Sequence, residues 1–302
     1  MSVDTPGVEE SLPVGVHMAT EIASQAVIWS QVLAEPSSTL DLLPSKDENV
    51  AVVGCGTSYY MAEVYARHRE ALGRGTTRAI VASELDRLHP GEVLLLISRS
   101  GTTRDVLRVA KRFHDTTRIT GIIGTPASPL VDACDQSVLL AYADEISTVQ
   151  TRFATSVLTL LRRSLGHDLS QLPAAAAKAL EVPLELKDYD HFVFLGGGVA
   201  VGLAAEAALK CLEAAGVWAE SYPVNEYLHG PVAAANSRSL VWSLSPVPED
   251  VANVVKQTGA TLKRPTFEAQ VELIMCQRLA LELSRLAGKD PDHPRHLHRS
   301  VT

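Results

Sequence analysis

The sequence predicts an α/β fold of two subdomains, each a parallel sheet flanked by helices in a flavodoxin-like αβα sandwich. Three observations lead to this prediction. Short apolar runs of strand length alternate with amphipathic stretches of helix length, a pattern typical of parallel sheets covered on both faces. Two of the apolar runs, at 50–53 and 191–195, are followed by a glycine-x-glycine turn that opens a helical stretch. The strand–helix pattern restarts at the second run, so we expect two similar halves.

The first half starts with a helix at 16–33, whose apolar residues recur on one face until Pro36 ends it. Apolar runs then predict strands, and the periodic stretches between them predict helices. Strands are expected at 50–53, 79–81, 93–97 and 119–123, an edge strand at 138–140, and helices at 58–72, 104–113 and 153–165.

Leu172-Pro173 and the alanines that follow predict a helix that connects the two halves. In the second half, strands are expected at 191–195 and 239–244, and helices at 199–215, 248–258 and 266–287. We therefore divide the chain into an N-terminal helical segment at 1–45, a first domain at 46–172 and a second domain with a C-terminal tail at 185–302.

Composition excludes several classes of function. The chain has 302 residues and a net charge of -8, with no dense basic cluster, which argues against nucleic acid as a partner. No apolar run approaches the length of a membrane span, and the acidic stretch at 1–10 is unlike a signal peptide. Four cysteines without CxxC spacing predict a reduced, cytoplasmic protein without a thiolate metal site: Cys55, Cys134, Cys211 and Cys276.

The turn at Ser98–Thr103 carries the strongest signal of a binding site. A buried strand stops at Ser98, four hydroxyl side chains and Gly101 fall within six residues, and a helix starts at Arg104. Unpaired N–H groups at a helix start bind anions, hydroxyls add donors, and glycine lets the backbone come close. An ordinary helix N-cap needs one hydroxyl, so four of them favour a phosphate site.

A second turn, Gly54–Ser58, could cradle phosphate in the same way or could be a plain tight turn. It lacks the wider glycine spacing and the lysine of a P-loop. The glycine-rich loop 196–202, with Glu220 further on, resembles a dinucleotide-binding loop, so a nicotinamide-dependent enzyme is a weaker alternative.

Three charged residues stand on the alanine- and leucine-rich helix of the second half. Glu206, Lys210 and Glu213 are spaced to fall on one face. They could form a surface salt-bridge stripe, or they could present a base and a cation to a substrate that loses a proton from carbon. The residues alone leave both interpretations open.

Histidines give weaker signals. His229 lies beside a Gly-Pro break on a loop, where a solvated histidine is commoner than a catalytic one. His293, His296 and His298 suggest a metal site by their number, but their tail context without a cysteine favours a solvated basic tail. We expect no metal and no cofactor.

Taken together, these segments resemble the sugar isomerase (SIS) domain family. The pattern is nearest to the isomerase half of glucosamine–fructose-6-phosphate aminotransferases and to stand-alone glucosamine-6-phosphate deaminases of that type. The resemblance covers nearly the whole chain. It rests on the two turns above, on 145–155, on the helix around Lys210, on 219–231 and on 290–297.

The resemblance implies a homodimer with shared active sites and a sugar phosphate as the small-molecule partner. Glu213 would be the base that moves a proton between C1 and C2, and Lys210 would neutralise charge near the enediolamine. His229, reaching in from a neighbouring subunit, would assist ring opening. The sugar phosphate would contact Cys55, Gly56, Thr57, Ser58, Ser98, Arg99, Ser100, Thr103, Gln150 and Arg299.

The chain departs from the family pattern at several positions. Arg99 replaces a glutamine of the phosphate turn, Gln150 replaces a serine that contacts the sugar, and Arg299 replaces a lysine near the ring oxygen. Arginine stays protonated, so at position 299 it can bind anions but carries protons poorly. Ser2 stands where a glutaminase would have its catalytic cysteine, and the short stretch 259–267 predicts that the second domain lacks a strand there.

The resemblance therefore predicts an enzyme that isomerises a 6-phosphorylated amino sugar. Deamination is the favoured direction because no glutaminase domain is present in the sequence to supply ammonia. Deglycation of a fructosamine phosphate and simple ketose isomerisation are close alternatives. A phosphosugar sensor is the non-catalytic alternative, and the combination of Glu213, Lys210 and His229 argues against it because sensing needs only the phosphate turns.

Overall fold

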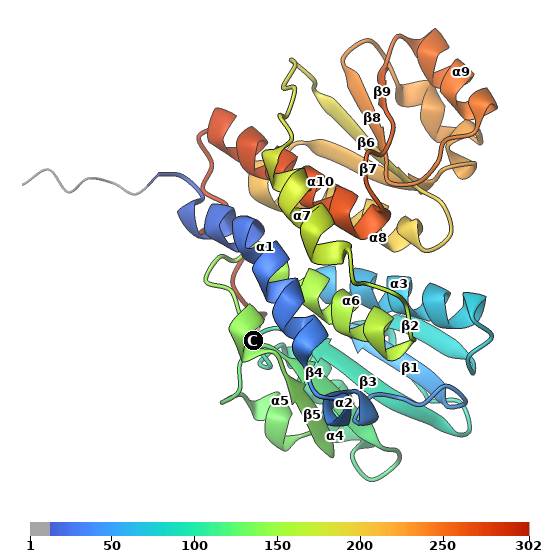
Figure 1. Ribbon diagram of the computed structural model, residues 1–302, viewed down its shortest axis with the longest axis vertical. Coiled ribbons are helices and arrows are strands. Elements are labelled where there is room, and N and C mark those ends of the chain that lie inside the picture. The colour runs from blue at the N-terminus through green and yellow to red at the C-terminus, as the bar shows by residue number, and fades with distance from the viewer. Residues whose placement is uncertain (1–12, 302) are drawn as a thin grey trace, which may run out of the picture.

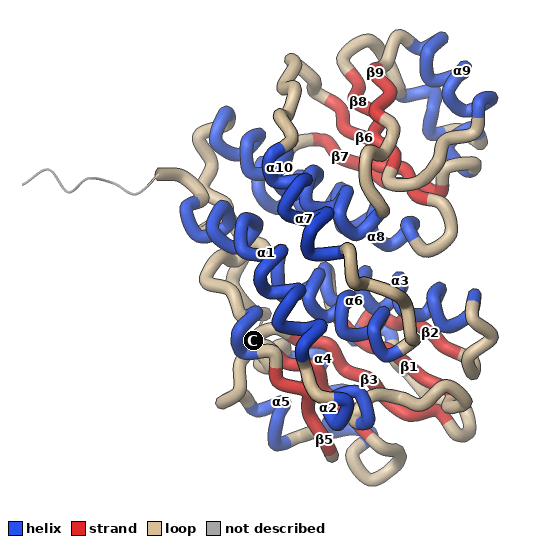
Figure 2. The backbone as a smooth tube through the Cα atoms, in the orientation of Figure 1, coloured by secondary structure: helices blue, strands red, loops and turns tan. Residues whose placement is uncertain are grey.

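The computed structural model describes residues 13–301 as two α/β halves that pack against each other through helices (Figure 1). The predicted fold class is confirmed, because each half contains a parallel sheet flanked by helices. Figure 2 shows the two groups of strands separated by a layer of helices. Within the described residues, no helix combines the length and the apolar character needed to cross a bilayer.

The first sheet has five parallel strands in the order β2-β1-β3-β4-β5. The strands are β1 (Asn49–Gly54), β2 (Thr77–Val81), β3 (Glu92–Ser98), β4 (Ile119–Ile123) and β5 (Gln136–Leu139). The helices of this half are α1 (Val16–Ala34), α2 (Ser37–Asp41), α3 (Thr57–Ala71), α4 (Arg104–Phe113), α5 (Pro129–Asp132), α6 (Arg152–Ser164) and the connecting α7 (Leu172–Glu181).

Both faces of the first sheet are covered. Val52 and Leu95 belong to a core with residues of α1, α3 and α6, whereas Val53 and Leu96 on the other face pack with α4. Strands buried on both faces need apolar side chains at every position, which explains why β1, β3 and β4 stand out as apolar runs.

The second sheet has four parallel strands in the order β7-β6-β8-β9, the order of the first sheet without its last strand. Its strands are β6 (His191–Gly196), β7 (Trp218–Pro223), β8 (Ser239–Ser243) and β9 (Thr261–Lys263), and its helices are α8 (Ala200–Ala215), α9 (Glu249–Thr258) and α10 (Ala269–Leu286). Short 3-10 turns lie at 82–84, 141–143, 226–228 and 231–234.

The prediction that the stretch 259–267 lacks a strand is wrong. Thr261–Lys263 form β9, which pairs with β8 in the register Leu240 to Thr261. The stretch is short because β9 has only three residues, and residues 264–268 connect it to α10.

One apolar core extends through the helices between the sheets. It contains Met18 of α1, Val64 of α3 and Leu158 of α6 from the first half, together with Leu203 of α8 and Phe194 of β6 from the second. The two halves therefore share buried surface in addition to the cores that each half has of its own.

The order of the first sheet creates a crevice at its carboxyl edge. β1 pairs with β2 on one side and with β3 on the other. The chain leaves β1 toward α3 on the inner face and leaves β3 toward α4 on the outer face. Ligands of open parallel sheets bind where connections diverge in this way, so the turns after β1 and β3 mark the expected site.

Candidate functional site

A pocket of about 200 Å³ lies at this edge of the first sheet. The turn after β1, the start of α4, the loop before α6, the end of α8 and the C-terminal residues all contribute to its wall. The lining residues are Cys55, Gly56, Thr57, Thr103, Thr148, Gln150, Glu213, Leu297, His298, Arg299, Ser300 and Val301.

The turn after β3 is held by its own hydroxyl groups. Ser98 Oγ accepts a hydrogen bond from the Gly101 N–H at 3.1 Å, and Ser100 Oγ accepts one from the Thr102 N–H at 3.2 Å. Gly101 has a φ of 62°, and a Cβ at this position would lie 2.0 Å from Ser128 Oγ, so the turn requires glycine. No side chain caps α4, although Thr103 occupies the N-cap position. The hydroxyls therefore do not serve as an ordinary helix cap.

The turn after β1 connects the pocket to the second half of the chain. Gly56 has a φ of 52° and precedes the first residue of α3, Thr57. The Thr57 hydroxyl is buried and accepts a hydrogen bond from Lys210 Nζ at 2.8 Å. A side chain of α8 thus reaches the phosphate-type turn of the first sheet.

The three charged residues of α8 form a largely buried cluster. Lys210 and Glu206 are fully buried, whereas the Glu213 side chain keeps 23% of its surface exposed and lines the pocket. Lys210 Nζ lies 2.5 Å from Glu213 Oε2 and 3.3 Å from Glu206 Oε1. This burial excludes a surface salt-bridge stripe, whereas the presentation of a base and a cation to a substrate stays a prediction.

Burial and charge oppose each other at Lys210 and Glu206. Burial disfavours the ammonium of Lys210, but the two carboxylates outweigh it and raise its pKa, so the lysine stays protonated. Burial raises the pKa of Glu206 to about 7, even though the nearby lysine acts in the opposite direction. Neither oxygen of Glu206 makes a hydrogen bond within the described residues.

The raised pKa of Glu206 predicts a pH-dependent stability. In the unfolded chain this carboxyl ionises near 4.5, and in the fold it ionises at about 7. Between these values the folded chain keeps a proton that the unfolded chain has lost, so the free energy of unfolding falls as the pH rises from 4.5 to 7. Glu206→Gln removes this loss. Calorimetry measures the melting temperature of this variant minus that of the parent chain. We expect this difference to grow by roughly a few degrees from about pH 5 to about pH 8.

The exposed Glu70→Gln variant is the matched control, because Glu70 lies on the surface of α3. The difference in melting temperature between this control variant and the parent chain should not change over the same pH range. A Glu206→Gln difference that stays constant with pH would contradict the assignment of the buried carboxyl.

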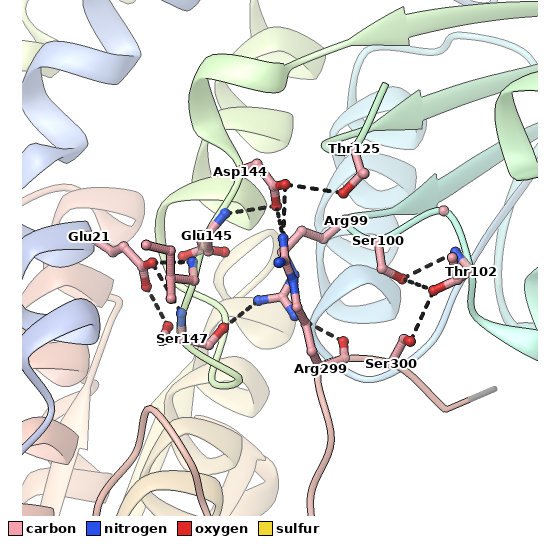
Figure 3. A network of polar contacts seen from close by, with 12 residues as sticks. Glu21, Arg99, Ser100, Thr102, Thr125, Asp144, Glu145, Ser147, Arg299 and Ser300 are labelled. Atoms are coloured by element: carbon pink, nitrogen blue, oxygen red, sulfur yellow. Dashed lines mark hydrogen bonds and ion pairs between the residues drawn. The ribbon is translucent and has the colours of Figure 1, made fainter. Parts of the chain in front are cut away.

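The end of the chain forms one wall of the pocket. Residues 297–301, hereafter the tail segment, all line it. The Arg104 N–H at the start of α4 donates to the Val301 carbonyl at 2.9 Å, and the Thr102 hydroxyl donates to Ser300 Oγ at 2.9 Å (Figure 3). His298 lines the pocket and is exposed, as are His293 and His296, in agreement with the predicted solvated histidine tail. Among residues 13–301, no three His, Cys, Asp or Glu side chains are arranged to hold a metal ion.

The structure brings most of the predicted site residues together. Those that line the pocket are Cys55, Gly56, Thr57, Thr103, Gln150, Glu213 and Arg299. Lys210 lies directly behind Thr57 and Glu213, and Ser98 and Ser100 shape the turn that leads to Thr103. Ser58 is buried in the first turn of α3 and is not part of the lining.

Two predicted residues lie elsewhere. The Arg99 guanidinium is buried and donates to the carbonyls of Ser147 and Arg299, so it is not part of the lining (Figure 3). His229 is exposed on the loop that follows β7 and does not line the pocket of its own chain. A contribution of His229 to a neighbouring subunit stays a prediction.

Sequence reasoning missed several lining residues. Thr148 lies within the predicted sugar-site segment 145–155 but was not singled out. Leu297 belongs to the predicted segment 290–297, whereas His298, Ser300 and Val301 were not singled out, because they reach the site through contacts with residues distant in sequence.

Known protein sequences are similar to this chain over most of its length. The model of the family described as SIS domain matches residues 43–163. A glutamine–fructose-6-phosphate aminotransferase (isomerizing) from Legionella pneumophila is 27% identical over 349 residues, which cover 94% of this chain and 58% of that protein. The Pseudomonas aeruginosa enzyme of the same name is 28% identical over 318 residues, 85% of this chain and 52% of that protein. The chain spans a little over half the length of these curated relatives.

Solved structures share the fold over nearly the whole chain. A glucosamine-6-phosphate deaminase from Thermotoga maritima superposes with a TM-score of 0.82 at 25% identity, covering 94% of this chain and 99% of that one. The C-terminal domain of glucosamine-fructose-6-phosphate aminotransferase from Francisella tularensis gives 0.80 at 23% identity, with 97% and 100% covered. A tagatose-6-phosphate ketose/aldose isomerase from Escherichia coli gives 0.74 at 20% identity, with 93% and 97% covered.

Proposed function

Because residues 43–163 form a SIS domain and the chain is homologous to the isomerase domain of glutamine–fructose-6-phosphate aminotransferase, we propose that it is a sugar-phosphate isomerase of the deaminating kind. Its substrate would be a 6-phosphorylated amino sugar. The reaction would move a proton from C2 to C1 and release ammonia.

One observation carries this proposal. The Glu213 carboxylate lies at the pocket wall with Lys210 Nζ 2.5 Å away, and the same Nζ donates to Thr57 in the turn after β1. A base, a fixed cation and the turn after β1 thus belong to one connected network, and Thr103 from the turn after β3 lines the same pocket. Proton transfer at carbon needs this combination, whereas recognition of a phosphosugar without chemistry needs only the turns.

The proposed reaction follows from these positions. The sugar phosphate binds with its phosphate at the turn after β3, which provides binding energy away from the reacting carbons. Glu213 removes the proton from C2 of the open-chain amino sugar, and the Lys210 ammonium stabilises the charge that develops. Return of the proton to C1 gives an imine at C2. Addition of water to that imine releases ammonia and leaves the ketose phosphate.

The similarity to the glucosamine-6-phosphate deaminase of Thermotoga maritima, with a TM-score of 0.82 at 25% identity, supports the deaminating direction. A ketose–aldose isomerisation without nitrogen is the second candidate, since Glu213 would perform the same proton transfer on a 2-hydroxy sugar.

A panel of hexose and hexosamine 6-phosphates tests the proposal. We expect ammonia and a ketose phosphate from one hexosamine 6-phosphate, measured by a coupled ammonia assay and a ketose assay. Ketose formation without ammonia would select the nitrogen-free isomerase instead. If no compound reacts while several raise the melting temperature, the chain is a sensor and the proposal is wrong.

Removal of the turn hydroxyls tests the phosphate site. Ser100→Ala with Thr103→Ala is expected to weaken binding of every phosphosugar by about tenfold or more, since hydrogen bonds to a charged group contribute about 1.5–3 kcal/mol each. Titration calorimetry measures this change. The exposed Ser83→Ala is the control and should leave affinity unchanged. Equal affinities in all three proteins would sink the assignment of the phosphate turn.

A further inference from the structure

The tail segment is joined to the rest of the site by residues that the proposed chemistry does not use. Its approach is fixed first at Asp292, whose carboxylate accepts hydrogen bonds from the His17 and Met18 N–H groups at 2.9 and 2.8 Å. The Asp292 carbonyl in turn accepts a hydrogen bond from Thr148 at 3.2 Å. The chain then crosses to the pocket, where Figure 3 shows Arg99 next to the tail segment and Arg299, within the tail segment, next to Asp144.

Arg99 holds the backbone of the tail segment through a hydrogen bond. Its Nη2 donates to the Arg299 carbonyl at 2.9 Å, and its Nη1 donates to the Ser147 carbonyl at 2.7 Å (Figure 3). The Arg99 side chain is itself fixed, because it is buried and its own carbonyl accepts hydrogen bonds from Gly124 and Thr125. One guanidinium therefore connects the turn after β3, the loop before α6 and the tail segment.

Asp144 holds the tail segment through the side chain of Arg299. Arg299 Nη2 lies 2.8 Å from Asp144 Oδ1 and 2.9 Å from Oδ2, and Asp144 Oδ2 accepts a further hydrogen bond from Thr125 at 3.1 Å. The charge of Arg299 is thus already matched by a carboxylate. The pair is partly exposed, with 45% of the Arg299 side chain and 25% of the Asp144 side chain accessible, so it can open more readily than the buried contacts of Arg99.

We propose that Arg99 and Asp144 are positioning residues that hold the tail segment as the wall of the substrate pocket and thereby set the affinity for the sugar phosphate. This inference rests on the proposed function and deepens it. Arg99 acts on the backbone at position 299, whereas Asp144 acts on the side chain at that position. Arg299 then anchors the tail segment to Asp144. The resembling family has a lysine at this position, and arginine does not take over the proton-carrying role of that lysine.

Asp144→Asn tests the proposal without disturbing the buried arginine. We expect amide hydrogen exchange at 297–301 in the unliganded protein to quicken by about three- to fivefold, because a partly exposed ion pair is lost. The KM for glucosamine 6-phosphate should rise by a similar factor, while kcat stays within about twofold. Asp144→Glu keeps the carboxylate and should recover part of both effects.

A double variant separates this role from a direct contact with substrate. If Asp144 acts only through Arg299, Asp144→Asn with Arg299→Gln should show the same tail exchange as either single variant. The exposed Asp115→Asn, in the loop after α4, is the matched control for loss of a carboxylate. Unchanged exchange at 297–301 in Asp144→Asn, or a fall in kcat with KM unchanged, would overturn the proposal.

Arg99 is tested by Arg99→Lys, which keeps the charge but cannot bridge two carbonyls in the same fork geometry. We expect the KM to rise by about tenfold or more, beyond the effect of Asp144→Asn. If this variant does not melt cooperatively, the exchange data on the Asp144 variants decide alone. If no phosphosugar reacts in the parent chain, the proposed function fails, whereas the exchange data still decide whether the tail segment is held as described.

Discussion

Replacement of Glu213 by glutamine is expected to reduce kcat by about 10²–10⁴-fold, the usual contribution of a positioned general base. The amide keeps the shape of the side chain and can still accept a hydrogen bond from Lys210, whose Nζ lies 2.5 Å from Oε2 in the parent chain. It cannot take a proton from carbon. Affinity for the sugar phosphate should therefore change by no more than about threefold, because uniform binding is kept.

Steady-state kinetics and titration calorimetry on the same preparation measure the two quantities. Glu282→Gln is the matched control, since Glu282 pairs with Arg285 on the surface of α10 and does not line the active-site pocket. A variant that loses affinity and turnover in parallel would make Glu213 a substrate ligand. A variant that keeps full kcat would exclude it as the base.

Replacement of Lys210 by methionine is expected to be the most destabilising change at the site. The parent lysine is fully buried, with the carboxylates of Glu206 and Glu213 at 3.3 and 2.5 Å and the Thr57 hydroxyl at 2.8 Å. Breaking a buried ion pair by removing one partner typically costs about 3–5 kcal/mol, because the other charge is left without compensation. Denaturant unfolding should show a loss of this size, together with a large fall in kcat.

A second substitution separates the loss of charge from the loss of packing. Glu206→Gln in the Lys210→Met background removes the buried carboxylate that has lost its cation, so part of the stability should return. Lys178→Met on the exposed face of α7 is the control and should change stability by less than about 0.5 kcal/mol. If Lys210→Met and Lys178→Met have the same free energy of unfolding, the charged cluster of α8 does not contribute to stability.

The regular part of the fold could be predicted because burial leaves a local pattern in the sequence. The helix at 104–113 and the strand at 119–123 match α4 and β4 at both ends. β7 was not predicted, because Trp218–Pro223 is an edge strand that carries Glu220, Ser221 and a proline and shows no apolar run. β9 was not predicted because three residues are too few to show a period.

The site could be predicted only where its residues are neighbours in sequence. The hydroxyl turn and the charges on α8 each have a local spacing that points to chemistry. The contact between Arg99 and the Arg299 carbonyl joins residues 200 positions apart, and no spacing records it. From the sequence, both arginines were expected to contact the substrate. In the structure, Arg99 donates to two backbone carbonyls and Arg299 pairs with the Asp144 carboxylate.

The common core between the sheets has a thermodynamic consequence. Helices of both halves bury apolar side chains in one shared interior, so each half loses part of its buried surface if the other unfolds. We expect a single heat-absorption peak in calorimetry, with equal calorimetric and van't Hoff enthalpies. The same coupling fixes the spacing between the phosphate turn, which comes from one half, and the base, which comes from the other.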